Sequence, residues 1–170
     1  MKSGAETPRL FLAVALAVVV LDFLTKRLAV SLLLPVPPVE VIGEWVRLRL
    51  VYNQGAAFGL HLGPFQRWIF LAIALAAVIL LWRLVRSSDP RDTLRQVSAG
   101  LVAGGAAGNL IDRIRGTQGV VDFIDIGVGA TRWPTFNVAD MGVSCGAIAL
   151  AVSLWLEDAE RARAGTVSST

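Results

Sequence analysis

Long apolar blocks restrict the folds that this chain can adopt more than any other feature of its sequence does. Every residue from Leu10 to Leu21 is apolar, and further apolar blocks cover residues 65–84, 97–114 and 136–156. A helix of about 20 apolar residues is long enough to cross the hydrocarbon core of a bilayer. The sequence therefore predicts a mainly α-helical membrane protein of one domain, with a first span at about 9–29 and one span in each later block.

The composition agrees with this fold class. Hydrophobic residues make up 55% of the chain and charged residues 17%, and the mean hydropathy is +0.63. The formal net charge is +3, but the basic residues flank the apolar blocks and do not alternate with aromatic residues, so we expect no nucleic-acid partner. With one cysteine and one histidine, the chain can form no internal disulfide and offers no His/Cys cluster for zinc.

The segments between the blocks have a different pattern. Prolines follow Leu34 and end the first helix, and residues from Val46 to Tyr52 alternate in a way that predicts an amphipathic strand of a small sheet at the membrane surface. A second short strand is expected at Val120–Asp125. The polar tail, residues 157–170, is predicted to lack stable structure.

The third apolar block carries a glycine at every fourth position, Gly100, Gly104 and Gly108. Small residues on one helical face allow neighbouring backbones to approach closely where lipid provides no hydrophobic drive. We therefore expect this helix to be central in the bundle.

Polar side chains concentrate at the ends of these helices. If the third and fourth spans are antiparallel, the end of the third, the start of the fourth and the far end of the first lie at one membrane face. The residues concerned are Asp22, Lys26, Asn53, Asn109, Asp112, Arg113, Asp122, Asn137 and Asp140. A charge at the centre of a membrane helix costs roughly 2.5 to 3.5 kcal/mol, so such a concentration predicts a functional site.

Asp122 and Asp140 are the best candidates for chemistry within this group. Each stands near an aromatic residue, and neither has a cationic partner in its own turn. Two carboxylates in a partly dry site share one proton, and such a pair can hydrolyse an amide with water. Asp112, which is adjacent to Arg113, is instead expected to be a structural ion-pair or hydrogen-bond member.

Spacing alone leaves three other interpretations open. The polar residues could form a buried network that only fixes helix packing, or a pathway for protons or ions. They could also form a calcium or magnesium site from Asp112, Asp122, Asp125 and Asp140. Apart from that possibility, Asp125 is assigned no role.

Five motifs occur between Arg9 and Leu156. They are D-x-x-T-K at 22–26, N-x-G-A-A-F-G at 53–59, G-G-x-x-G-N-L-I-D-R at 104–113, V-V-D-F at 120–123 and F-N-x-A-D at 136–140. Each motif is weak by itself, but together, and in this order, they resemble the motifs of the bacterial lipoprotein signal peptidases, the type II signal peptidases.

The resemblance implies an aspartyl endopeptidase that removes signal peptides just before a diacylglyceryl-modified cysteine. The family's catalytic aspartates map onto Asp122 and Asp140. Substrate-binding roles map onto Asn53, Gly55, Asn109, Asp112, Arg113 and Asn137. Asp22 and Lys26 are expected to support the site.

The resemblance also implies an architecture and a location. Four transmembrane helices would carry a small extracytoplasmic β-cradle in the bacterial inner (plasma) membrane, with both termini cytoplasmic and the active site at the periplasmic face. The basic residues divide equally between the two faces, so the positive-inside rule alone leaves this orientation open. Expected partners are lipid-modified prolipoproteins and membrane lipid, with no metal, no cofactor and a monomeric enzyme.

Overall fold

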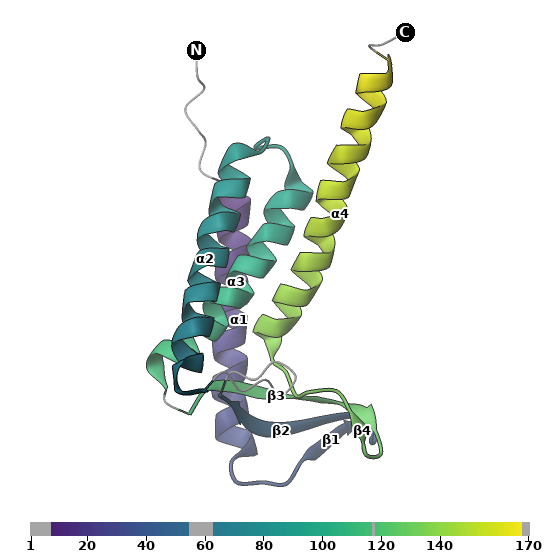
Figure 1. Ribbon diagram of the computed structural model, residues 1–170. Coiled ribbons are helices and arrows are strands. Elements are labelled where there is room, and N and C mark those ends of the chain that lie inside the picture. The colour runs from purple at the N-terminus through teal and green to yellow at the C-terminus, as the bar shows by residue number, and fades with distance from the viewer. Residues whose placement is uncertain (1–7, 55–62, 117, 168–170) are drawn as a thin grey trace.

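The computed structural model describes residues 8–54, 63–116 and 118–167, which form long helices and a small antiparallel sheet (Figure 1). Each of the four apolar blocks forms a helix. These are α1 (Arg9–Leu33), α2 (Gln66–Ser87), α3 (Thr93–Arg115) and α4 (Val138–Val167). Within the described part of the chain, two helices are long and apolar enough to cross a membrane, namely α2 and the Val138–Arg163 part of α4.

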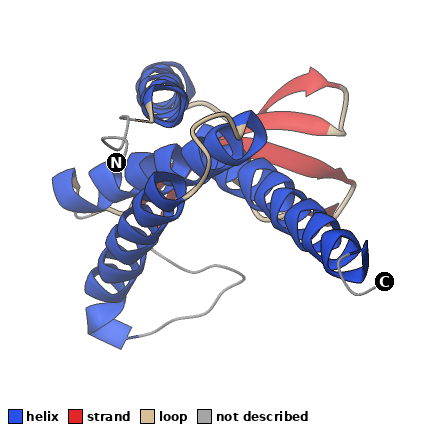
Figure 2. Cartoon of the chain, turned by 90° about the horizontal axis from the view of Figure 1, so that it is seen from above, coloured by secondary structure: helices blue, strands red, loops and turns tan. Residues whose placement is uncertain are grey.

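The sheet is built from the two connections at one end of the helices. β1 (Val39–Ile42) and β2 (Val46–Asn53) lie between α1 and α2, and β3 (Val120–Val128) and β4 (Thr131–Arg132) lie between α3 and α4. The strand order is β1-β2-β3-β4, and neighbouring strands are antiparallel. The strands project sideways from beneath the helices (Figure 2).

The two predicted strands are confirmed, and the register between them matters for the site. β2 begins at the predicted residue, and β3 runs three residues further than predicted. Val51 pairs with Asp122, and Asn53 pairs with Val120. The central pair of strands therefore brings Asn53 and Asp122 together from sequence positions 69 residues apart.

The expectation that α3 is central is also confirmed, because α3 packs against all three other helices. A Cβ atom on Gly104 would lie 2.7 Å from the carbonyl oxygen of Ala15 in α1. A Cβ atom on Gly105 would collide with the carbonyl oxygen of Ala139 in α4. Glycine therefore sets how closely α3 approaches both neighbours.

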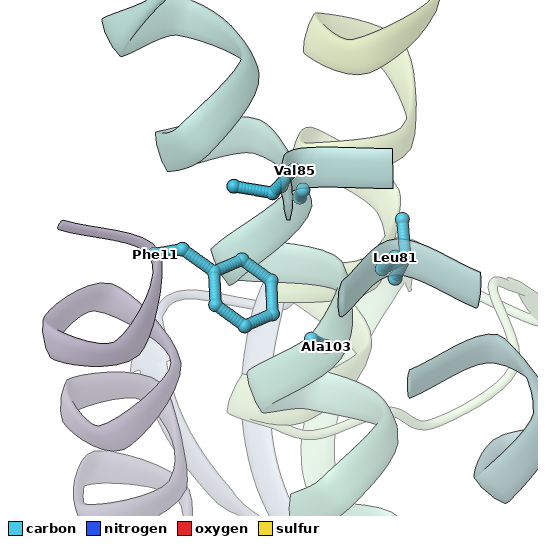
Figure 3. Close-up of a cluster of buried hydrophobic side chains, with 5 residues drawn as sticks. Phe11, Leu81, Val85 and Ala103 are labelled. Carbon is cyan, nitrogen blue, oxygen red and sulfur yellow. The ribbon is translucent and has the colours of Figure 1, made fainter. Parts of the chain in front are cut away.

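A cluster of buried side chains joins three helices at the end of the bundle opposite the sheet. Figure 3 shows Phe11 from α1, Leu81 and Val85 from α2, and Ala103 from α3. The ring of Phe11 lies 5.9 Å from that of Trp82, measured between centroids. This cluster fixes α1 and α2 against α3 far from the polar end of the molecule.

The expectation for the polar tail is wrong over most of its length, because α4 continues to Val167. Glu157 accepts a hydrogen bond from Arg95, a buried residue in the first turn of α3, and a second one from Arg161 one turn further along α4. These ion pairs hold the end of α4 in helical form. No hydrophobic pattern in residues 157–167 indicates that this segment contacts α3.

Candidate active site

Lys26 is the centre of a buried polar network at the end of the helices where the sheet lies (Figure 1). Its side chain is about 4% exposed, and its Nζ atom lies 2.7 Å from Asp22 Oδ2, 2.9 Å from Asp112 Oδ2 and 2.9 Å from Asn109 Oδ1. An ammonium group has three donors and no acceptor, so these contacts use all of its hydrogen-bonding capacity. Asp22 and Asp112 therefore both pair with Lys26, and Asp112 forms no described ion pair with the adjacent Arg113.

Asp22 connects this network to the start of α4. Its Oδ1 atom accepts a hydrogen bond from the backbone N–H of Ala139 at 2.9 Å. The first N–H groups of a helix have no partner within the helix and favour a negative charge. Gly108 makes room for the contact, since a Cβ atom there would lie 2.6 Å from Asp22 Oδ2.

Asp122 lies on β3 and is 1% exposed. Its carboxylate accepts hydrogen bonds from Asn53 Nδ2 at 2.9 Å and from Asn137 Nδ2 at 2.7 Å. Burial raises the pKa of Asp122 to about 6, the hydrogen bond from Asn53 opposes this rise, and the charge of Asp140 adds to it. The site therefore contains a carboxyl group that holds its proton closer to neutral pH than an exposed aspartate does.

Asp140 lies in the first turn of α4 and forms a reciprocal cap with Asn137. Asp140 Oδ2 accepts the backbone N–H of Asn137 at 3.1 Å, and Asn137 Oδ1 accepts the backbone N–H of Asp140 at 2.9 Å. This is the arrangement of a capping box, in which two residues three positions apart satisfy each other's N–H groups. Asp140 Oδ1 also accepts a hydrogen bond from Asn109 Nδ2 at 2.8 Å.

Asn137 joins the two aspartates into one network. It is fully buried, its Nδ2 atom donates to Asp122, and its backbone N–H donates to Asp140. The same Nδ2 atom lies 3.1 Å from Asn109 Oδ1, which also accepts from Lys26. Residues from α1, β2, α3, β3 and α4 therefore meet around one pair of carboxylates.

Arg113, in the last turn of α3, interacts electrostatically with both carboxylates of this pair. Its Nη1 atom donates to the carbonyl oxygen of Asn109 at 3.2 Å, and its guanidinium lies 5.2 Å from the ring centroid of Phe70 in α2. The guanidinium attracts the charges of both Asp122 and Asp140. Gly55, the remaining predicted substrate-binding residue, lies outside the described residues.

A hollow of about 420 Å³ opens onto Asp122 from the side of the sheet. Its wall includes Asn53, Gln66 and Thr135. Gln66 begins α2, and its Nε2 atom donates to the carbonyl oxygen of Gln54. Sequence reasoning missed Gln66 and Thr135; the only available signal was a glutamine at the start of an apolar block.

The four carboxylates of the alternative metal site do not gather. Asp112 binds Lys26, and Asp125 binds Arg132, whose Nε atom lies 2.8 Å from Asp125 Oδ1. Arg132 Nη1 also donates to the carbonyl oxygen of Glu44, so Arg132 connects the β3–β4 hairpin to the β1–β2 hairpin. Among the residues described, no group of three or more His, Cys, Asp or Glu side chains is arranged to hold a metal ion.

The chain is similar to known proteins over most of its length. The family model described as signal peptidase (SPase) II matches residues 14–156. A lipoprotein signal peptidase of Hydrogenovibrio crunogenus is 42% identical over 146 residues, which are 84% of either chain. One from Rhodococcus jostii is 43% identical over 148 residues, covering 84% of this chain and 71% of the other.

Two solved structures share the fold. Both are described as bacterial membrane enzymes determined by the in meso method. The structure at 2.3 Å resolution has a TM-score of 0.76 and 29% identity, and the match covers 88% of this chain and 90% of the other. The structure at 1.9 Å resolution has a TM-score of 0.72 and 31% identity, covering 85% and 91%. With the family model matching most of its length, this chain belongs to the signal peptidase II family, the lipoprotein signal peptidases.

Proposed function

We propose that this protein is an aspartyl endopeptidase that cleaves the signal peptide from prolipoproteins just before a diacylglyceryl-modified cysteine. Asp122 and Asp140 form its acid/base pair. The observation that carries the assignment is the double contact of Asn137, which donates its side-chain N–H to one carboxylate and its backbone N–H to the other. A buried residue that binds both carboxylates holds them in fixed relation, which acid/base catalysis requires.

The reaction needs one proton on the pair. The raised pKa of Asp122 favours it as the proton donor, and Asp140 then acts as the base. Asp140 takes a proton from a water molecule whose oxygen attacks the scissile carbonyl carbon, while Asp122 donates its proton to the carbonyl oxygen. In the second step Asp140 gives its proton to the leaving amine, the C–N bond breaks, and Asp122 recovers a proton from the tetrahedral intermediate.

The other polar residues of the site position the pair and the substrate. Asn53 donates to Asp122 Oδ2 and Asn109 donates to Asp140 Oδ1, the two carboxylate oxygens that Asn137 does not bind. Arg113 supplies positive charge beside both carboxylates and faces a hollow of about 210 Å³ that Asn53 also lines. In this proposal the signal peptide lies across these hollows, with Asn53, Asn109, Asp112, Arg113 and Asn137 around its backbone. Gly55, which lies outside the described residues, is proposed as a substrate-binding residue from the sequence alone.

A lipid-modified substrate also explains why the site lies at the end of the helices. In the proposed arrangement all four helices cross the inner membrane, both termini are cytoplasmic, and the sheet lies at the periplasmic face. The substrate's acyl chains remain in the bilayer while its scissile bond reaches the depth of Asp122 and Asp140. Lateral diffusion in the membrane then delivers the substrate without exposing its lipid to water.

The test replaces each aspartate by asparagine and measures cleavage of a lipidated precursor beside an unlipidated one. Asp122→Asn and Asp140→Asn each remove a proton-transferring group, so we expect a loss of at least about 1,000-fold in turnover with little change in folding. The wild type should cleave only the lipidated precursor.

Asp125→Asn provides the matched control on the same strand. Its carboxylate binds Arg132 and does not line the hollow at Asp122, so this variant should lose stability and keep turnover within about tenfold. Full activity in either catalytic variant would refute the proposed pair. Equal losses in all three variants would indicate that these carboxylates serve only the fold.

A further inference from the structure

A second polar hollow lies at the end of the bundle opposite the sheet. It has a volume of about 530 Å³ and is bounded by the start of α1, the end of α2 and the α2–α3 connection. Its polar lining consists of Arg9, Arg86, Arg91, Ser88, Thr93 and Gln96. We call this hollow the arginine pocket.

The charge of the arginine pocket is one-sided. Three arginines from three different elements line it, and none of the described residues that line the pocket is acidic. Nor does any carboxylate of the described residues form an ion pair with Arg9 or Arg91. Like charges around one hollow repel each other unless an anion lies between them.

The wall of the pocket is held in shape by its own hydrogen bonds. Asp89 Oδ1 accepts the backbone N–H of Arg91 at 2.8 Å, and buried Gln96 donates to the carbonyl oxygen of Pro90 at 2.6 Å. Val85 belongs both to the pocket lining and to the buried cluster of Figure 3. The α2–α3 connection is therefore held in shape on this side of the pocket, which reduces the cost of ordering that part around a ligand.

Apolar side chains continue from the pocket along the helices. Leu12 and Leu16 follow Arg9 at i+3 and i+7 on one face of α1, and both are exposed. On α2, Trp82 and exposed Ile79 precede Arg86 by four and seven residues, and the Arg86 guanidinium lies 5.8 Å from the ring centroid of Trp82. A bound anion would thus have apolar surface beside it in the direction of the membrane.

We propose that the arginine pocket binds the phosphodiester headgroup of an anionic glycerophospholipid, with the acyl chains lying along the exposed apolar faces of α1 and α2. Guanidinium groups bind phosphate oxygens through charge-assisted hydrogen bonds, and basic pockets between membrane helices suit such headgroups. In the orientation proposed above, the lipid comes from the inner leaflet. The site is separate from the aspartate pair, so its occupancy does not depend on the chemistry at the other end.

The experiment measures lipid binding to the full-length protein in a neutral detergent by native mass spectrometry. Phosphatidylglycerol is titrated beside zwitterionic phosphatidylcholine. The test variant is Arg9→Gln/Arg91→Gln, and the matched control is Arg83→Gln/Arg163→Gln, which removes two exposed arginines that do not line the pocket. Both variants lower the net charge by the same amount.

We expect the wild type and the control variant to prefer phosphatidylglycerol. The Arg9→Gln/Arg91→Gln variant should bind it about 30-fold more weakly, or about fivefold for each arginine. An equal loss of phosphatidylglycerol binding in both variants would show that the preference comes from diffuse surface charge, and it would overturn the proposal. An unchanged preference in the test variant would also overturn it. If that variant fails to fold, Arg91→Gln alone should still show the fivefold loss, since Arg91 is an exposed residue of a connection.

A separate arm distinguishes a lipid from a soluble anion. Inorganic phosphate at millimolar concentration should not displace phosphatidylglycerol, because it cannot use the apolar faces beside the pocket. Complete displacement would assign the pocket to soluble phosphate and overturn the lipid proposal. Cleavage is assayed on the same preparations, so failure of lipid binding and failure of the proposed peptidase activity are separate results.

Discussion

Lys26 shows how one buried residue determines the orientation of another. An ammonium group can only donate hydrogen bonds, so Asn109 must turn its Oδ1 atom toward Lys26 and its Nδ2 atom toward Asp140. The donor that reaches Asp140 is therefore fixed by a residue on α1 that does not touch the aspartate.

Lys26→Met tests this dependence. The variant leaves the carboxylates of Asp22 and Asp112 without their cation, and breaking a buried ion pair in this way costs about 3 to 5 kcal/mol. We expect a lower free energy of unfolding in detergent and a loss of cleavage. Arg27→Met is the matched control, because Arg27 is the next residue along the helix and is exposed; it should change stability by less than about 0.5 kcal/mol. Similar effects in the two variants would argue against a central role for Lys26.

Asn53→Ala tests the protonation of Asp122. The hydrogen bond from Asn53 favours the ionised carboxylate, so its removal should raise the pKa of Asp122 further above about 6. In the proposed mechanism the pair needs one proton, so kcat/KM should fall when pH rises through the upper apparent pKa of the pair. The alkaline limb of the pH profile should therefore move upward by about one pH unit, the equivalent of one charged hydrogen bond.

The neighbouring residue provides the comparison for this pH profile. Gln54 is exposed, and Gln54→Ala removes a side chain of similar size from the next position. This control should leave the limb in place. A downward shift in Asn53→Ala, or no shift, would contradict the assignment of Asp122 as the proton donor.

At the scale of elements, the sequence predicts which face of a helix packs against its neighbours, but it does not predict which residues of the neighbours that face contacts. The spacing of Gly100, Gly104 and Gly108 correctly indicated the packing face of α3. Asp112 is a structural ion-pair member as expected, but its partner is not the adjacent Arg113, because residues at i and i+1 do not face each other on a helix. The actual partner, Lys26, depends on how α1 is rotated against α3, which no local pattern encodes.

Gly105→Ala tests the contact between α3 and α4. The added methyl would collide with the carbonyl oxygen of Ala139 and with Val143, pushing α4 away from α3. Overpacking of this kind costs about 1 to 3 kcal/mol, and it should move Asp140 away from Asn109. We expect a lower unfolding midpoint and at least about tenfold slower cleavage.

Gly116→Ala is the control for this substitution. Gly116 caps the same helix, and a Cβ atom there would meet its nearest neighbour at 3.4 Å, an ordinary contact. Its unfolding midpoint should match that of the wild type. A normal midpoint and normal activity in Gly105→Ala would show that the α3–α4 contact tolerates the extra methyl.

At the scale of the molecule, the active-site candidate lies where the sheet joins the helices. The sequence indicated four helices, two strands and the polar residues between them. It did not indicate β1 and β4, because strands of four and two residues leave too short a pattern to detect. Nor did it reveal the Asp125–Arg132 pair, which depends on the fold of the β3–β4 hairpin.

The proposed orientation predicts that the sheet end of the molecule is accessible from outside the cell and that the end carrying the two termini is not. In a Cys145→Ser background, Glu44→Cys places a thiol at the β1–β2 turn and Glu160→Cys places one on the far part of α4, and both positions are exposed. A membrane-impermeant maleimide applied to spheroplasts should label Cys at 44 in intact cells and Cys at 160 only after lysis. Labelling of both positions in intact cells would reject four crossings with cytoplasmic termini.

The two aspartates lie on different parts of the fold, one on the sheet and one on a helix. Asp122 belongs to β3 in the sheet, whereas Asp140 belongs to the first turn of α4, and Asn137 is the only residue described here that donates to both. The packing of the sheet against the helices therefore sets the separation of the two carboxylates. If the proposed pair is catalytic, the fit between sheet and bundle is part of its chemistry, and a substitution that shifts this fit should slow cleavage even when both acids are intact.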